Sequence, residues 1–282
     1  MAPEQVLYVA DYPAGVRDDG GVLVIAHLSD THFGGRWSPA DRARRVLDHV
    51  AALHPPVDVV LVTGDIADHG TTEEYDEAAA VLGAWAGPAP MLVLPGNHDR
   101  REGYAAWRGA PADRPVNEAH RVGGVLFLMA DSMVPAPEGE RIDHGVLTEE
   151  TLAWLDTELA ARAPGERAVV CLHHPPVEIH IELMDPIRLV NAHALAAVLD
   201  RHDHVVAVLT GHAHSACATS YDVMHRPLPV LIPGGVASTV TLDAEPFPDI
   251  TGELAPTFAI HFLSDDGSLV THWRSLDMPT AP

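Results

Sequence analysis

Short apolar runs alternate along the first half of the chain with segments whose apolar residues recur at helical spacing. The runs that predict buried strands are residues 22–29, 57–63 and 91–94. Ser38 followed by Pro39 is typical of a helix start, and Thr71 or Thr72 followed by acidic residues predicts a second helix that ends near Trp85. A strand, a helix and another strand in this order predict parallel neighbours in one sheet.

The second half repeats this plan, and we expect it to have more antiparallel character. The predicted strands are residues 125–130, 168–172, 205–210, 229–232, 258–263 and 269–274, and the predicted helices are residues 148–162 and 191–201. No repeat or linker divides the halves in the sequence. We therefore expect an N-terminal extension over residues 1–20 and a single domain over residues 21–282.

Composition places the chain among globular proteins. At 282 residues and 47% hydrophobic content it can bury a large core. The first twenty residues lack the pattern of a signal peptide, and no apolar run approaches the roughly 20 residues that span a bilayer. The two cysteines, Cys171 and Cys217, are too few for a disulfide framework, so the sequence predicts a soluble, cytoplasmic protein with no membrane partner.

The chain is strongly acidic. Its formal charge is −23, and all 17 basic residues are arginine. An acidic excess repels phosphate backbones, and no lysine-rich run is present to form a basic track. Nucleic acid is therefore not an expected partner.

Clusters of carboxylate, amide and imidazole side chains follow five of the expected strands. They are Asp30-Thr31-His32, Gly64-Asp65, Gly96-Asn97-His98-Asp99, His173-His174-Pro175 and Gly211-His212-Ala213-His214. Open α/β sheets bind ligands at the carboxyl ends of their strands. Residues i and i+2 of an extended segment face the same way, so Asp30 with His32, and His212 with His214, would each present two donors to one cavity. This pattern predicts a hydrolytic site with two metal ions.

The order of these clusters resembles the calcineurin-like metallophosphoesterase superfamily, and within it the class III cyclic nucleotide phosphodiesterases and the related glycerophosphodiesterases. The resemblance implies an α/β fold: a four-layer αββα sandwich of two mixed β-sheets flanked by helices. It also implies that Asp65 bridges two metal ions. The remaining ligands that it implies are Asp30, His32 and His214 for the first ion and Asn97, His173 and His212 for the second.

The ligand types indicate which metals the site would take. Imidazole and oxygen ligands without thiolate suit Mn, Fe, Co or Zn, and we expect Fe/Mn or Mn/Mn, with Zn or Co as alternatives. Asp30 and Asp65 remove only two of the four positive charges that two divalent ions bring. The pocket would stay positive and attract an anionic phosphoester.

His98 is the expected catalytic residue that does not bind metal. It follows Asn97 and should point toward the substrate, with Asp99 holding its ring in the protonated form. The resemblance implies that His98 is the acid for the leaving group or stabilises the transition state. We expect His174 to support or pack against the metal ligand His173 without binding metal itself. A contact with the substrate is the alternative. Other histidines, including His27, match no ligand position and are expected to be hydrogen-bonded or solvated at the surface.

The second cluster favours a diester over a monoester. Protein phosphatases of the superfamily typically continue it as Gly-Asp-x-Val-Asp-Arg-Gly, whereas Asp68 is followed here by His69, so a phosphate-binding arginine is missing. We therefore expect a metal-bridged hydroxide to hydrolyse a small phosphodiester, above all a 3',5'-cyclic nucleotide such as cAMP. The alternatives are a glycerophosphodiester and, less favoured, a phosphomonoester or a non-catalytic scaffold. Motifs of serine hydrolases, P-loop enzymes and Rossmann dehydrogenases do not occur.

Residues 176–191 are apolar yet carry several charged side chains. Such a segment following the fourth cluster predicts a lid over the cleft, a subunit contact in a homodimer, or an ordinary connecting loop.

Overall fold

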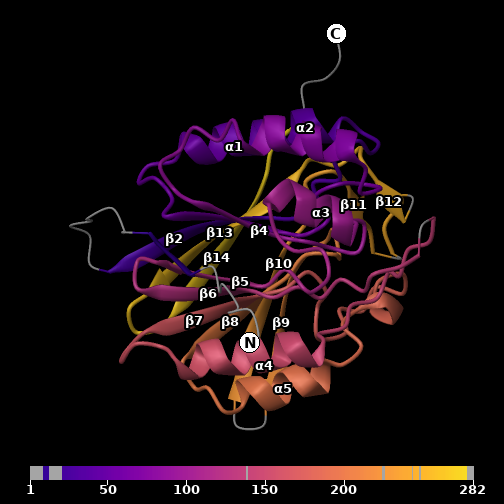
Figure 1. Cartoon of the computed structure of the whole chain (residues 1–282). Helices are drawn as coiled ribbons and strands as arrows, with labels where there is room; N and C mark the ends of the chain where they lie inside the picture. The colour runs from indigo at the N-terminus through magenta and orange to yellow at the C-terminus, as the bar shows by residue number, and fades with distance from the viewer. Residues whose placement is uncertain are drawn as a thin grey trace.

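Two β-sheets lie face to face between two sets of helices in the computed structural model (Figure 1). The structure describes residues 9–12, 21–137, 139–223, 226–242, 244–247 and 249–277. The five-stranded sheet has the order β14 (Leu269–Ser275), β13 (Thr257–Ser264), β2 (Val22–Leu28), β3 (Val59–Thr63) and β4 (Met91–Leu94). Its helices are α1 (Pro39–Ala51), α2 (Thr72–Leu82) and α3 (Arg101–Arg108).

The second sheet has seven strands and is covered by helices at the other end of the molecule in Figure 1. Its order is β1 (Val9–Tyr12), β5 (Glu118–Val122), β6 (Val125–Met129), β7 (Arg167–Cys171), β8 (Val205–Leu209), β10 (Arg226–Pro233) and β9 (Ala216–Val223). The remaining elements are α4 (Glu149–Ala160), the 3-10 turn η1 (Asp185–Ile187), α5 (Ala192–Leu199), β11 (Thr239–Val240) and β12 (Ile250–Thr251). The expected α/β sandwich of four layers is thus confirmed.

Strand β2 shows why the sheets stack. Its side chains alternate between the two faces: Leu23 and Ile25 join the apolar cluster between the sheets, whereas Val24, Ala26 and Leu28 pack toward the helices. Both faces are buried, so the strand reads as a continuous apolar run. Burial of this kind on several neighbouring strands fixes the sheet positions from which the polar loops extend.

The predicted helices begin within a residue of the observed starts, although α3 was not predicted and one cap differs from the usual form. Thr71 accepts a hydrogen bond from the backbone of Glu74, whose carboxylate accepts one from the backbone of Thr71, forming a capping box. Ser38 precedes Pro39 as expected, but its φ is 53° and its side chain makes no cap hydrogen bond. The Ser38-Pro39 pair therefore marks the start of α1 in the sequence, although Ser38 does not cap the helix.

Both ends of the described chain form strands of the sheets. Strand β13 pairs antiparallel with β2, so C-terminal residues complete the sheet that begins the domain. Strand β1, inside the expected N-terminal extension, pairs parallel with β5. The rest of that extension, residues 1–8 and 13–20, lies outside the described residues, as do residues 278–282. The second half has more antiparallel character than the first, as expected: β5–β6, β9–β10 and β13–β14 are antiparallel, whereas β2–β3 and β3–β4 are parallel. Its strands β6, β7, β8 and β10 are nevertheless parallel neighbours.

His27 and His261 correct the expectation that such histidines lie at the surface. Both are fully buried, and Nδ1 of His27 lies 3.1 Å from Nε2 of His261. The chain of hydrogen bonds continues from His27 to Thr63 at 2.9 Å and from His261 to Thr271 at 2.8 Å. Burial lowers the pKa of His261 to about 3 and that of His27 well below its usual value, so both rings are neutral.

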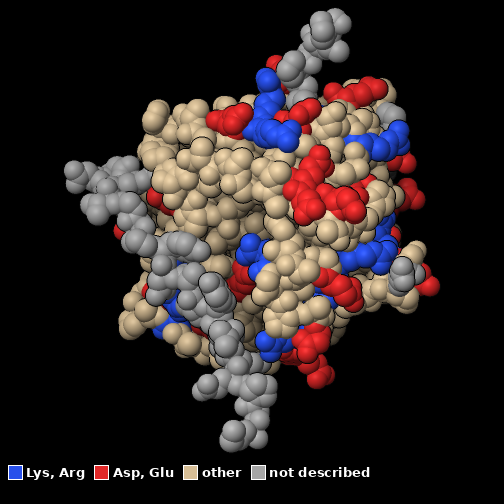
Figure 2. Space-filling model, turned by 45° about the horizontal axis from the view of Figure 1, so that its top comes forward, with Lys and Arg blue, Asp and Glu red and all other residues tan. Residues whose placement is uncertain are grey.

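Charged side chains on the molecular surface do not form a basic track on the face that Figure 2 shows. Arginines stand there in separate places among acidic residues. Among the helices that the structure describes, none has the length and apolar character needed to cross a membrane.

Candidate active site

The five polar clusters follow β2, β3, β4, β7 and β8, so both sheets supply side chains to one site. Backbone hydrogen bonds connect their loops directly. Asp30 N–H donates to the carbonyl of Gly64 at 3.1 Å, and Gly211 N–H donates to the carbonyl of His173 at 2.9 Å. The second of these bonds joins neighbouring strands of the seven-stranded sheet, and the first joins neighbours in the five-stranded sheet. The carboxyl ends of the strands thus bring together residues far apart in the sequence.

The loop conformations differ from the extended segments that we expected. Positive φ values are found at Asp30 (57°), His32 (44°), Asp65 (51°), His212 (67°) and His214 (52°). Residues other than glycine seldom adopt this left-handed conformation, which costs energy and occurs disproportionately at functional sites. Both pairs do contribute to the same site, but tight turns place them there rather than the alternation of an extended chain.

One group of side chains that could hold a metal ion consists of Asp30, His32, Asp65 and His214, whose ligand atoms lie within 4.8 Å of one another. Nδ1 of His32 donates to the carboxylate of Asp68 at 2.9 Å, and Nδ1 of His214 donates to the carbonyl of Ser238 at 3.2 Å. Each ring therefore keeps a lone pair on Nε2. The two Nε2 atoms lie 3.0 Å apart, an arrangement that suits a shared cation.

A second set of acceptors converges around His173. Its Nδ1 donates to the carbonyl of Thr63 at 2.7 Å, and its Nε2 lies 3.1 Å from Oδ1 of Asn97 and 3.3 Å from Oδ1 of Asp65. Burial would lower the pKa of His173, but the charge of Asp65 raises it to about 9. The surroundings of the His173 ring therefore favour a positive charge. Nε2 of His212 is buried with no hydrogen-bond partner among the described residues, which fits a nitrogen that binds a metal ion.

Asp65 touches both sets of residues. Its Oδ2 lies 3.5 Å from Nε2 of His32, whereas its Oδ1 faces Nε2 of His173. A β-carbon on Gly96 would lie 2.1 Å from Oδ1, so only glycine leaves room for this carboxylate. Burial opposes ionisation of Asp65, but the charge of His173 and then that of His98 hold its pKa well below the usual range. The carboxylate is ionised, and its two oxygens face the two sets of side chains.

His174 lies close enough to His173 and His212 for the three to form a further metal-binding group. Its nitrogens, however, already have partners: Nδ1 lies 2.8 Å from Oγ of Ser132, and Nε2 lies 3.2 Å from the carbonyl of Asp143. Because a carbonyl only accepts, Nε2 carries the hydrogen and Nδ1 accepts from the Ser132 hydroxyl. Burial lowers the pKa of His174 well below its usual value. The ring is neutral and supports a loop, and neither nitrogen is left for a substrate.

His98 is held by Asp68, not by Asp99. Nδ1 of His98 lies 2.8 Å from the carbonyl oxygen of Asp68 and 3.5 Å from its carboxylate. Burial would lower the pKa of His98, but the charge of Asp65 and the hydrogen bond to Asp68 raise it. Nε2 lies 4.0 Å from Oδ2 of Asp65 and so faces the candidate metal ligands.

Asp99 has a different role from the expected one. Its carboxylate accepts hydrogen bonds from the backbone N–H groups of Ile66, Ala67 and Gly96 and from the hydroxyl of Tyr75. It therefore fixes the loops that follow β3 and β4 relative to each other. The expectation that Asp99 orients the His98 ring is wrong, because the Asp99 carboxylate is bonded to these four groups while the His98 ring is bonded to Asp68.

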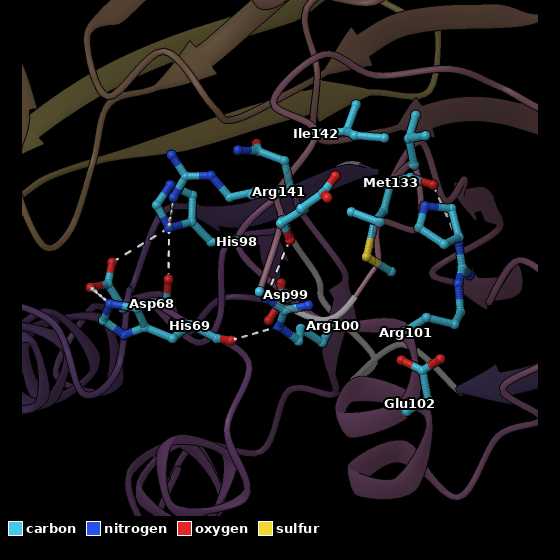
Figure 3. Close-up of a pocket in the computed structure, with 16 residues that line it drawn as sticks. Asp68, His69, His98, Asp99, Arg100, Arg101, Glu102, Met133, Arg141 and Ile142 are labelled. Carbon is cyan, nitrogen blue, oxygen red and sulfur yellow. Dashed lines mark hydrogen bonds and ion pairs between the residues drawn. The ribbon is translucent and has the colours of Figure 1, made fainter.

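A cleft of about 210 Å³ opens beside Asn97 and His98 (Figure 3). Arg100 and Arg141 contribute positive charge to its lining, and Met133 and Ile142 contribute apolar surface. Nη1 of Arg141 lies 3.0 Å from Nδ1 of His98, across 43 positions of sequence. Sequence reasoning missed this arginine, since no cluster of metal-ligand residues marks its loop.

Residues 176–191 pack against the loops around the site and do not line this cleft. Ile181 and Met184 are buried with Val240 in a small apolar cluster. The backbone of Gly145 exchanges hydrogen bonds with residues 188 and 190, which connects the segment to the loop that carries Arg141. These contacts are those of a fixed connecting loop, and its expected roles as a lid or a homodimer contact stay predictions.

Comparison with known proteins agrees with this geometry. The family model of the calcineurin-like phosphoesterases matches residues 23–216. A 3',5'-cyclic adenosine monophosphate phosphodiesterase of Pseudomonas aeruginosa is 31% identical over 268 residues, which cover 92% of each chain. A glycerophosphodiester phosphodiesterase of Enterobacter lignolyticus is 32% identical over 213 residues, covering 71% of this chain and 73% of that protein.

Among solved structures, a dimetal phosphatase from Danio rerio superposes with a TM-score of 0.66 at 18% identity. The alignment covers 90% of this chain and 96% of that chain. At this level of identity the likeness concerns the fold.

Proposed function

Because the chain belongs to the calcineurin-like phosphoesterase family and is a metal-dependent phosphodiesterase, we propose that it hydrolyses a small phosphodiester, with a 3',5'-cyclic nucleotide such as cAMP as its preferred substrate. The single observation that carries the proposal is the convergence of acceptor atoms on Asp65 from two sides. On one side stand the Nε2 atoms of His32 and His214, 3.0 Å apart, and on the other Nε2 of His173 and Oδ1 of Asn97.

The ligands that we propose are those which the site brings together around Asp65. Asp30, His32 and His214 would hold one ion and Asn97, His173 and His212 the other, with Asp65 shared. Fe/Mn or Mn/Mn suits this donor set, with Zn or Co as alternatives. When bound, such a pair lowers the pKa of a shared water to about 7 and stabilises negative charge on the phosphate.

The chain's own residues would orient the substrate and move a proton. His98 carries its hydrogen on Nδ1, which donates to the Asp68 carbonyl, and presents Nε2 to the side of the metal ligands. A protonated ring there can transfer its Nε2 proton to the leaving oxygen of the ester. Asn97 would orient its carbonyl oxygen toward the ion, since its amide nitrogen lies 3.4 Å from the carboxylate of Asp143.

The cleft favours a substrate with a flat apolar part. Met133, Val134, Pro135 and Ile142 belong to its lining and provide apolar surface on which a nucleobase can rest and which a glycerol moiety does not use. A glycerophosphodiester is the second candidate, because a relative named for that activity is as similar to this chain as the cyclic nucleotide enzyme.

A substrate panel tests the proposal. Purified protein reconstituted with Mn would be assayed with cAMP, cGMP, glycerophosphocholine, bis(p-nitrophenyl) phosphate and p-nitrophenyl phosphate. We expect the highest kcat/KM among the natural esters for a cyclic nucleotide. A higher value for glycerophosphocholine would select the second candidate, and a preference for p-nitrophenyl phosphate over its diester would contradict both.

A further inference from the structure

Arg141 stands beside the candidate catalytic histidine on a loop outside the five polar clusters. Its guanidinium approaches His98 from the cleft side, and Figure 3 shows the side chain lying over the imidazole. Nδ1 of His98 already donates to the Asp68 carbonyl, so Nη1 of Arg141 has no acceptor in that ring. Two nitrogen atoms that both carry hydrogens therefore lie 3.0 Å apart.

Asp143 holds Arg141 in this place. Its carboxylate accepts from Nε of Arg141 and lies 3.4 Å from the amide nitrogen of Asn97. Its backbone carbonyl accepts from Nε2 of the buried His174. One loop residue thus connects the arginine to a proposed metal ligand and to a fixed imidazole.

The two other arginines of the cleft are occupied, and Arg101 pairs with the buried carboxylate of Asp131. Nε of Arg100 donates to the carbonyl of His69, and its Nη2 donates to the carbonyl of Glu140, both at 3.3 Å. Arg100 thereby connects the loop after β3 to the loop that carries Arg141. Arg141 keeps 45% of its side chain exposed and directs its unused donors into the cleft.

We propose that Arg141 binds a phosphate oxygen of the substrate, and that Asp143 positions it for this contact. The arginine takes the place of the phosphate-binding cation that is missing after Asp68. Guanidinium groups bind phosphate through charge-assisted, paired hydrogen bonds, and an anion placed here also separates Arg141 from His98. The inference rests on the proposed function in that it takes a phosphoester as the ligand of the site.

Calorimetric titration of inorganic phosphate into the Mn-loaded protein tests this contact without turnover. Losing one charge-assisted contact should weaken phosphate binding about 10- to 100-fold in Arg141→Ala. Arg141→Lys, which keeps the charge but not the paired donors, should fall between. Arg44→Ala is the matched control, because Arg44 on α1 is 52% exposed and pairs with Asp41 as Arg141 does with Asp143.

The positioning role of Asp143 has its own readout. Asp143→Ala should weaken phosphate binding less than Arg141→Ala, and the double variant should bind no more weakly than Arg141→Ala alone. Additive losses would overturn this part of the proposal and give Asp143 a role independent of the arginine.

The outcomes separate this inference from the proposed function. Unchanged phosphate affinity in Arg141→Ala, or a loss of bound metal in that variant, would overturn the role of Arg141 even if the native protein hydrolyses bis(p-nitrophenyl) phosphate. Arg141-dependent phosphate binding by a native protein that hydrolyses no diester would uphold the contact and overturn the proposed function. An equal loss of phosphate affinity in Arg44→Ala would show that the effect comes from the net charge of the protein, and it would overturn the proposed contact.

Discussion

Nε2 of His32 and Nε2 of His214 face each other at 3.0 Å, although each ring already donates a hydrogen from its Nδ1. Two neutral imidazoles with this tautomer direct lone pairs at each other, which is unfavourable without a cation between them. The contact joins the loop after β2 to the loop after β8. A bound ion would therefore hold together two loops from different sheets, and its removal would loosen the fold as well as the site.

Removal of metal is the first prediction. Dialysis against a chelator should abolish diester turnover and lower the melting temperature, and added Mn should restore both. A ligand present at 100 times its Kd stabilises the native state by about 2.7 kcal/mol. Calorimetry and metal analysis of the same samples check this, and full activity in metal-free protein would contradict the metal centre.

Substitution of Asp65 tests the shared carboxylate. Asp65→Ala should lose both ions and all measurable turnover, because Asp65 faces His32 on one side and His173 on the other. Asp30→Ala is the matched control: it removes a buried carboxylate from one set only and should keep one ion. Elemental analysis gives the metal content, and two tightly bound ions in Asp65→Ala would refute the bridge.

Sequence predicted those features that depend on local chemistry. The strand Met91–Leu94 was located to the residue, because an apolar run between polar loops determines it. Strand β9 was missed, since Ala216–Val223 is an edge strand of small and polar residues that are mostly exposed or half-buried. The candidate ligands were found by their residue types at the ends of strands.

The contacts that organise the site depend on tertiary structure and were not predictable. Asp68 holds His98 across 30 positions, and Arg141 reaches it across 43. Asp99 was chosen as the partner of His98 because it is adjacent in sequence, yet adjacent side chains point apart. No pattern within one segment of the chain carries such information.

The buried pair of His27 and His261 predicts a loss of stability in acid. Burial lowers the pKa of His261 to about 3, and that of His27 lies well below 6.5, the value expected of an unfolded chain. Below pH 6.5 the unfolded chain binds protons that the folded rings do not, so the free energy of unfolding falls as pH decreases toward 3. At pH 5 the His261 ring should cost about 2 kcal/mol, and His27 adds to this loss in the same direction.

Urea unfolding at pH 7.5 and pH 5.0, with a chelator present throughout, measures this effect. The loss of unfolding free energy between the two pH values should be about 2 kcal/mol smaller in His261→Gln than in the native chain. Glutamine keeps a donor and an acceptor but does not titrate. Equal losses in both proteins would show that protonation of this pair does not cause the loss of stability at low pH.

The final prediction separates His98 from the metal ligands. Its Nδ1 is held by the Asp68 carbonyl at 2.8 Å, and neighbouring carboxylates raise its pKa, which favours the protonated ring. A group that donates a proton matters most when the leaving oxygen is a strong base. A ribose alkoxide needs that proton, whereas p-nitrophenolate departs without it.

His98→Ala should therefore keep its metal and lose about 100- to 10,000-fold in kcat on cAMP, but much less on bis(p-nitrophenyl) phosphate. In the native protein the activity on cAMP should fall as pH rises through the raised pKa of His98, because the proton to be donated is lost, and this limb should be absent from the variant. Equal losses on both substrates with unchanged metal content would instead make His98 a residue that binds phosphate charge. Loss of metal from His98→Ala would make it a support for Asp65, to which its backbone N–H donates at 2.9 Å. Steady-state kinetics with both substrates, together with metal analysis of each preparation, distinguish the three outcomes.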